Sequence, residues 1–427
     1  MNKINLTNQI LNFSSVLLCL IPFALITGPF LSDLFLVVIV INCLLLFYLN
    51  KDFSIFKNYY FYAFVFLWLI LTLNSIFTQN IVSFKSIFFY LRFLLFSLAV
   101  FFLISKKQKI LEYLLLIFLL IYFIFFIDTL YQFIFSQNLI GFIYDNPQNF
   151  RVTSFFGKDE VLGSYIARFF PILVYLIISS EKQVIKNNNL LLIFIYSIIS
   201  FVIVMLSGER TSLMLYILCI FFLFFSSFNL RKIIKFPIIG LIIIGGIIIY
   251  SSETIKNRMI STTLNQLGLF EGSERLVLFS KTYEGHYKIA YNMFKERPLI
   301  GHGPKMFRFY CSKKENINKE LLEVGACTTH PHNFYAQSLA ETGIIGFSVL
   351  SVFFIYIFRE FLLNFYFQIK FKKQKLSDQA ICLLSAYFLT FFPFLPSGNF
   401  FNNWLSIIIY FPLGFLIYLI KYKKYYV

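Results

Sequence analysis

Histidine is the residue type whose placement in this sequence most clearly suggests chemistry. All four histidines of the 427-residue chain lie in one fifth of it, between residues 252 and 335. An exposed imidazole can act as a base near neutral pH. A hydrogen bond that orders the loop is the better interpretation for His302 and His330.

Metal binding is the other chemistry that clustered histidines suggest. His330 and His332, separated by Pro331, would supply two ligands, whereas a zinc site needs three or four that converge. The sequence has neither an HExxH motif nor a paired CxxC pattern. We therefore predict no metal site.

The elements that position these residues are membrane spans. The chain is 59% hydrophobic and 13% charged, with a mean hydropathy of +0.77, whereas soluble proteins carry about 25% charged residues. This composition excludes a large soluble enzyme, and the continuous apolar runs exclude a porin-type barrel, whose strands would alternate. The net charge of +17 is no argument for nucleic acid, because membrane proteins concentrate Lys and Arg in cytoplasmic loops.

The predicted fold is all-α, with about twelve transmembrane helices and one large, partly helical loop. We divide the chain into spans 1–9 (1–251), the loop (252–335) and spans 10–12 (336–427). The apolar runs lie near residues 10–27, 31–48, 59–77, 84–104, 110–130, 160–180, 189–207, 211–228, 236–251, 338–358, 380–397 and 403–420.

The basic residues orient this topology. With the N-terminus inside, 19 basic residues fall in interior segments, whereas the short exterior loops hold only Lys85, Arg151, Lys158 and Arg210. The positive-inside rule therefore places both termini in the cytoplasm. The 252–335 loop lies outside, and long loops are translocated largely regardless of their charge.

Arginine and lysine divide unequally between the two sides. Only two of the 19 interior basic residues are Arg, against six of the 16 exterior ones: Arg151, Arg210, Arg258, Arg275, Arg297 and Arg308. The planar guanidinium suits bidentate recognition of phosphate. Arg210 is therefore a candidate anion ligand; its alternatives are an interfacial anchor and a local pair with Glu209.

Arg92 and Arg168 lie in the outer halves of spans, where a buried Arg marks either a functional site or a structural pair. The structural alternative is that either one pairs with Asp128 or Asp159 and holds helices together.

Cys311 and Cys327 are the only cysteines outside the spans. Because disulfides form and persist in the exterior compartment, we predict a bridge between them, contributing about 3 kcal/mol. A helix is predicted at 283–295, and the Gly/Pro turn 297–304 after it would let backbone approach a ligand or another chain closely.

Four short motifs resemble the O-antigen ligase and polymerase superfamily of bacterial membrane glycosyltransferases. The likeness covers roughly residues 145–358, with the span count and single large loop agreeing around it. The motifs are Arg-Val-Thr-Ser-Phe-Phe-Gly from Arg151, Ser-Gly-Glu-Arg from Ser207, Arg-Pro-Leu-Ile-Gly-His-Gly from Arg297, and His-Asn-Phe-Tyr from His332 with Glu-Thr-Gly-Ile-Ile-Gly from Glu341.

The resemblance implies inverting, metal-independent and cofactor-free transfer of a glycan from undecaprenyl pyrophosphate to an acceptor hydroxyl. It makes His332 the catalytic base and Arg151 and Arg210 the pyrophosphate ligands. The family often has another Arg, in an Arg-x-x-x-Trp pattern. Here that spacing gives Tyr283 and Tyr287, so the third phosphate ligand is left open between Arg275, His286 and Arg297.

Three functions are compatible with these sequence features. A ligase joins the glycan to lipid A–core, whereas a polymerase joins it to a second lipid-linked repeat; the large loop near the C-terminal end favours the ligase. A lipid-linked oligosaccharide flippase would place its polar residues near the midplane of the membrane, so it is less favoured. The resemblance places the protein in the bacterial inner membrane, among membrane lipids, with its active site periplasmic; His330, Arg168 and Glu209 are secondary site candidates.

Overall fold

The computed structural model describes residues 3–57, 59–143, 151–269, 276–277, 279–313, 319–423 and 425–427. Over these residues the chain is all-helical, as predicted, and its only β-structure is a pair of isolated bridges. The longer helices are α1 (Lys3–Ala24), α2 (Pro29–Asn50), α3 (Tyr59–Phe77), α5 (Leu91–Lys106), α6 (Lys109–Phe135), α7 (Leu162–Ser179), α8 (Gln183–Leu206), α9 (Arg210–Ser226), α10 (Phe228–Ser251), α13 (Lys281–Glu296), α16 (Phe334–Phe371), α17 (Asp378–Thr390) and α18 (Asn403–Tyr422). The short helices are α4 (Ile81–Phe88), α11 (Glu253–Lys256), α12 (Thr262–Gln266), α14 (Phe307–Ser312) and α15 (Lys319–Glu323).

Each of the twelve predicted apolar runs contains a helix, but the count of twelve spans is not established. Nine helices in the described part of the chain are long and apolar enough to cross a membrane. The apolar helices Phe61–Phe77 and Arg210–Ser226 are shorter, and α17 has only 13 residues. Pro393 and Pro396 follow α17 and cannot continue its hydrogen bonding, so the predicted 380–397 run ends early as a helix.

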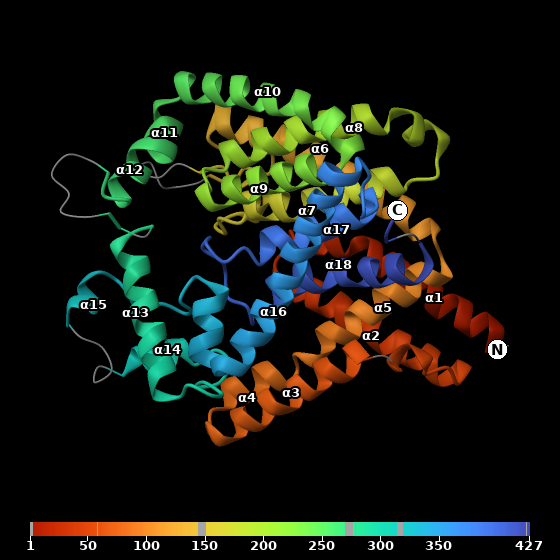
Figure 1. The fold of residues 1–427 in the computed structure, drawn as a ribbon, viewed down its shortest axis with the longest axis horizontal. Coiled ribbons are helices and arrows are strands. Elements are labelled where there is room, and N and C mark those ends of the chain that lie inside the picture. The colour runs from red at the N-terminus through yellow and green to blue at the C-terminus, as the bar shows by residue number, and fades with distance from the viewer. Residues whose placement is uncertain are drawn as a thin grey trace.

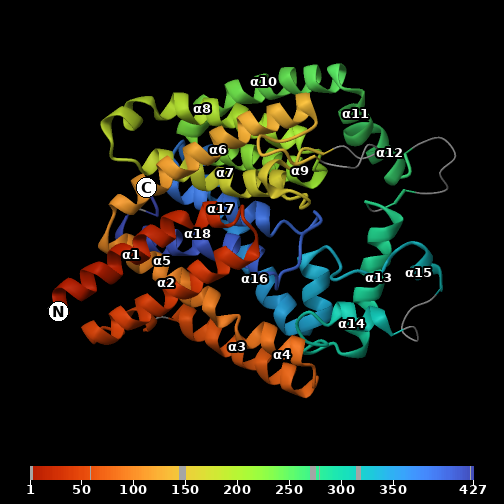
Figure 2. The ribbon, with the colours of Figure 1, turned by 180° about the vertical axis from the view of Figure 1, so that it is seen from behind.

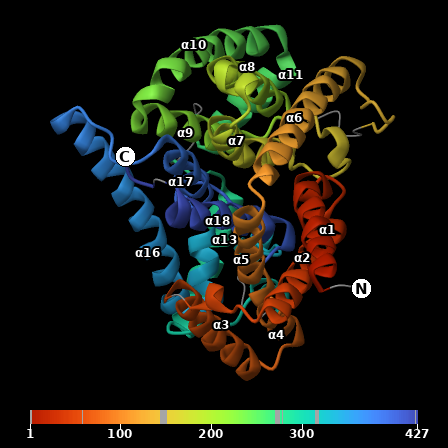
Figure 3. The same ribbon diagram turned by 90° about the vertical axis from the view of Figure 1, so that its right-hand side faces the viewer.

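The long helices pack around α7, which is the most enclosed of the nine candidate spans. Of the residues in its apolar stretch, 83% are buried, and α7 contacts α6, α8, α9, α17 and α18. Figure 3 looks along the bundle and shows α17 and α18 near the centre, with α1 and α2 on one side and α16 on the other. α7 therefore carries its one arginine, Arg168, into the interior.

The segments between α10 and α16 gather at one end of the bundle. Figures 1 and 2 show α11 to α15 together at that end, while the N- and C-termini lie toward the opposite end. The helix predicted at 283–295 is α13, and it begins where the Ser280 hydroxyl accepts a hydrogen bond from the Tyr283 N–H. Ile289, Met293 and Phe307 form a small core between α13 and α14 that is separate from the main one.

The Gly/Pro turn after α13 packs its backbone directly against a break in α16. Gly343, with φ of 64°, interrupts α16, and a Cβ there would lie 2.4 Å from the Leu299 carbonyl oxygen. The Ile344 N–H donates to Pro298 O at 2.8 Å, and the Gly303 N–H donates to Glu341 O at 2.8 Å. The glycines of two motifs thus join α13 to α16, and the turn approaches another segment of the chain.

Cys311 and Cys327 are free thiols in the structure, so the predicted bridge is not formed in it. The two residues are nevertheless adjacent, because the Cys327 Sγ lies 3.7 Å from the Cys311 carbonyl oxygen. Burial and the neighbouring Cys327 raise the pKa of the Cys311 thiol. The Cys311 thiol is therefore protonated and poorly reactive at neutral pH.

We predict that Cys311 and Cys327 form a disulfide when the protein is made with this loop in an oxidising compartment. The bridge would close the loop between the two cysteines, constrain the unfolded chain and add about 3 kcal/mol to its stability. Mass spectrometry of unreduced peptides would detect the pair. Recovery of both cysteines as alkylated thiols from the wild-type protein would contradict it, and Cys311→Ser is the matched control.

Candidate active site

His332 is held in an uncommon backbone conformation at the start of α16. Its φ is 53°, in the left-handed region that non-glycine residues rarely adopt and that recurs at functional sites. The next residue, Asn333, caps α16, because the Asn333 side-chain oxygen accepts hydrogen bonds from the Tyr335 and Ala336 N–H groups. The Ser397 N–H donates to His332 O at 2.8 Å. Hydrogen bonds to His332 and to the residue after it thus fix the backbone that carries the imidazole.

Three aromatic rings surround the His332 imidazole. The ring centroids lie 4.1 Å from His330, 5.2 Å from His286 and 5.7 Å from Tyr283. His286 and Tyr283 come from α13, one helical turn apart, so α13 supplies one wall of the site. The His286 Nδ1–H donates to Ala326 O at 2.6 Å, which leaves Nε2 as the acceptor nitrogen of a neutral ring.

The histidines of this cluster are neutral at physiological pH. Burial, with a smaller contribution from His286, lowers the pKa of His332 to about 4. Burial and the neighbouring His332 lower the pKa of His330 to about 3, and burial also lowers the pKa of His286. A neutral His332 can accept a proton from a hydroxyl, whereas a protonated one could not.

Arg210 lies at the first turn of α9, where the α8–α9 hairpin meets α12. Gly208, with φ of 66°, makes the turn, and its carbonyl oxygen accepts from Arg258 Nε at 3.4 Å. The Arg210 guanidinium donates to Thr263 Oγ1 at 3.0 Å and to Gln266 Oε1 at 2.7 Å. These neutral partners orient the fork, and no ion pair joins Arg210 to a carboxylate among the described residues.

Arg151 is positioned by the end of α6. The Gln132 side-chain oxygen accepts from the Thr153 and Ser154 N–H groups at 3.1 and 2.7 Å, and Asp128 accepts from the Ser154 hydroxyl. Arg151 Nη1 pairs with Glu160, while its buried Nε has no hydrogen-bond partner among the described residues. The guanidinium therefore keeps a free donor.

The two arginines and the histidine cluster meet at Tyr283. The Arg210 charge repels that of Arg151, so the two guanidiniums share one electrostatic environment. Burial raises the pKa of Tyr283, and the positive charges of Arg210 and Arg151 act against that rise. Tyr283 also contacts the His332 ring. The structure thus brings together Arg151, Arg210, His286 and His332.

Glu209 and Arg168 lie deeper and support the site. The Glu209 carboxylate caps α7, accepting from the Gly163 and Ser164 N–H groups at 2.7 and 3.1 Å. Burial raises the pKa of Glu209 to about 7. Arg168, 4% exposed, donates to Ser164 Oγ at 3.2 Å and also interacts with the Glu209 charge. Glu209 thus serves the end of α7 and is not a local partner for Arg210.

The pairing of Arg92 with Asp128 or Asp159 is wrong. Arg92 Nε pairs with Asp33 Oδ1 of α2 at 3.0 Å and joins α5 to α2. Asp128 is occupied elsewhere, because its carboxylate accepts from the Leu139 N–H and the Ser154 hydroxyl. Arg168 has no carboxylate within hydrogen-bonding distance in the described part of the chain.

Other sequence-based candidates lie away from the cluster. Arg297 caps the far end of α13, exposed, about 17 Å along the axis from His286. His302 bonds to Met293 O at 3.0 Å, a structural role as preferred from the sequence. Arg275, a third candidate phosphate ligand, lies outside the described residues. Of the two candidates among the described residues, His286 lies beside His332 and Arg297 does not.

Sequence reasoning did not nominate Tyr283, Arg308 or Glu341 as site residues. Arg308 contributes to the low pKa of His330, and its buried Nε has no partner among the described residues. Glu341 is fully buried, and its carboxylate accepts from the Phe307 N–H and Gln337 Nε2. The i, i+3 spacing of Tyr283 and His286 on one helix was the signal that could have identified Tyr283.

Metal ligation finds no support in the described residues, which contain no group of three or more His, Cys, Asp or Glu side chains arranged to hold an ion. The rings of His286 and His330 pack against the His332 ring at interplanar angles of 36° and 44°.

Comparison with known proteins agrees with the motifs. The family model described as O-antigen ligase matches residues 195–351, a segment that includes Arg210, His286 and His332 but not Arg151. No curated protein matches the chain. The resemblance predicted from the sequence is confirmed over this segment. Residues 195–351, a little over a third of this chain of apolar helices, are therefore similar to the O-antigen ligase family.

Proposed function

We propose that this chain is a metal-independent, inverting glycosyltransferase that moves a glycan from undecaprenyl pyrophosphate to a lipid A–core acceptor. The observation that carries the proposal is the position of Tyr283, which contacts the neutral His332 ring and lies in the field of Arg151 and Arg210. A base and a paired anion site therefore lie on either side of one residue.

The arginines suit the leaving group of this reaction. A pyrophosphate gains negative charge as its bond to the sugar breaks, and fixed positive groups in a site shielded from water stabilise that charge strongly. Thr263 and Gln266 hold the Arg210 fork without neutralising it, and the Arg151 Nε is available. Little reorganisation is then needed during the reaction.

His332 takes the role of base. The acceptor hydroxyl oxygen attacks C1 of the first sugar, its proton passes to His332, and the C1–O bond to the pyrophosphate breaks with inversion. The electron pair of that bond leaves on undecaprenyl pyrophosphate, and His332 then releases its proton to water. No step requires a metal or a cofactor.

The location we propose is the inner membrane, with the site on the periplasmic side and both termini cytoplasmic. The lysine-rich segments support this orientation, because Lys106, Lys107 and Lys423 lie at the end of the bundle opposite α13.

His332→Ala should lower the rate of glycan transfer about 100- to 10,000-fold while the protein stays folded, because general-base assistance is lost. Transfer would be measured with purified protein and a lipid-linked oligosaccharide. His302→Ala is the matched control, since the His302 ring bonds to Met293 O and lies 3.5 Å from Glu296, and it should keep near wild-type activity.

The pH profile separates a base from a structural histidine. Since His332 must be neutral and burial lowers its pKa to about 4, kcat/KM should stay level down to about pH 5 and fall below it. A fall centred near the ordinary histidine value of 6.5 would contradict the assignment.

Arg210→Lys should lower kcat about 100- to 1,000-fold, because an ammonium cannot reproduce the fork that Thr263 and Gln266 orient. Arg297→Lys is the control, at the far end of α13, and should leave kcat unchanged. Equal rates for Arg210→Lys and wild type would show that charge alone suffices and would remove the bidentate role.

Competing acceptors would identify the product. We expect purified protein, offered lipid A–core and a second lipid-linked glycan together, to attach the donor glycan mainly to lipid A–core. Mass spectrometry of the products measures the ratio. Elongated lipid-linked glycan as the main product would instead make the protein a polymerase.

A further inference from the structure

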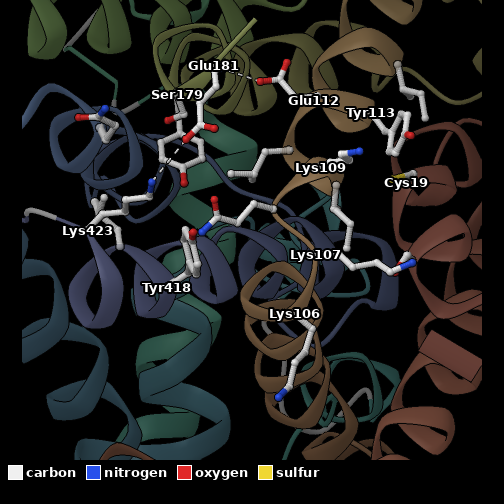
Figure 4. A pocket seen from close by; sticks show the side chains of 18 of the residues that line it. Cys19, Lys106, Lys107, Lys109, Glu112, Tyr113, Ser179, Glu181, Tyr418 and Lys423 are labelled. Atoms are coloured by element: carbon white, nitrogen blue, oxygen red, sulfur yellow. Dashed lines mark hydrogen bonds and ion pairs between the residues drawn. The ribbon is translucent and has the colours of Figure 1, made fainter. Parts of the chain in front are cut away.

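A large cavity opens at the end of the bundle that lies away from the histidine cluster. Its volume is about 1640 Å³, and it lies between α1, the α5–α6 junction, the end of α7 and the end of α18. Figure 4 shows Lys107 and Lys109 on one side of it and Lys423 and Tyr418 on the other. Sites for drug-sized ligands occupy about 300–1,000 Å³, so this cavity is larger than they need.

The rim of the cavity is positively charged. Five lysines and two glutamates line it: Lys106, Lys107, Lys109, Lys182, Lys423, Glu112 and Glu181. The Glu112 carboxylate accepts hydrogen bonds from the Ser180 hydroxyl at 2.8 Å and from the Glu181 N–H at 2.7 Å. The Glu181 carboxylate lies 3.8 Å from Lys423 Nζ.

Most of the lysine charge is uncompensated. Among the described residues no ion pair joins Lys106, Lys107, Lys109 or Lys182 to a carboxylate. Lys107 instead donates to the side-chain oxygen of Asn12, across from α5 to α1. The rim therefore has ammonium groups available to an anion.

The inner wall differs from the rim. Val16 and Leu20 of α1 and Ile117 of α6 give it an apolar surface. Tyr418 also lines the cavity; it is 1% exposed, and its hydroxyl has no hydrogen-bond partner in the part of the chain described. A buried hydroxyl without a partner is costly, and a polar ligand group in the cavity would satisfy it.

We propose that this cavity binds an anionic phospholipid, with its phosphate at the lysine rim and its acyl chains along α1 and α6. Basic pockets between membrane helices bind anionic head groups in this way. The apolar inner wall favours a lipid over a free anion. The proposal does not depend on the glycan transfer, which lies at the other end of the bundle.

Native mass spectrometry tests the proposal. The full chain is purified in detergent, mixed with phosphatidylglycerol or phosphatidylcholine, and released from the detergent in the spectrometer. Wild-type protein should retain phosphatidylglycerol selectively, and the combined change Lys107→Gln, Lys109→Gln, Lys423→Gln should cut that retention at least about tenfold. The matched control is Lys370→Gln, Lys372→Gln, Lys373→Gln, with the same loss of charge but outside the cavity, and it should retain the lipid.

Two further variants are measured in the same experiment. Replacing the same three lysines by Arg should restore retention, and Tyr418→Phe should weaken it without affecting the melting temperature in phosphatidylcholine. Equal retention of both lipids, equal loss in the control triple variant, or displacement of the lipid by equimolar inorganic phosphate would overturn the proposal.

Discussion

The backbone contact between the Pro298–Gly303 turn and the break in α16 is the constraint on which the candidate site depends. Gly301 and Gly343 allow the two segments to approach so closely that a Cβ on either would lie within about 2.5 Å of the other's backbone atoms. This contact fixes α13 beside the start of α16. Without it, Tyr283 and His286 would have no fixed position relative to His332.

The charge arrangement follows from the same architecture. The histidines lie against one another and against buried walls, so burial keeps them neutral. Arg210 lies at the start of α9, where the neutral side chains of Thr263 and Gln266 hold it, and Arg151 pairs with Glu160 close to the end of α6. A neutral base on one side and fixed cations on the other suit the proposed transfer of a glycosyl group from a pyrophosphate leaving group.

Local features of this fold were predictable from the sequence because they depend on neighbouring residues. The apolar runs, the helix at α13, the clustering of histidines and the need for glycine in the turn all follow from composition and spacing. The O-antigen ligase resemblance came from short motifs in the sequence, and the family match over residues 195–351 covers the segment that holds His332 and Arg210.

Long-range partners were not predictable in the same way. Arg92 pairs with Asp33, 59 residues away, and the α13 residue Tyr283 meets Arg210 only because distant helices pack together. Arg297 looked equivalent to the other exterior arginines, but helix geometry carries it to the far end of α13. The length of α17 was overestimated because apolar character continued past the residue where proline ends the helix.

The most direct test of this account is a structure of the protein with undecaprenyl pyrophosphate bound. The account predicts that the diphosphate contacts the guanidiniums of Arg151 and Arg210, with the His332 ring facing the position that the sugar C1 would occupy. A diphosphate bound at Arg297, or at the lysines on the opposite end of the bundle, would contradict it.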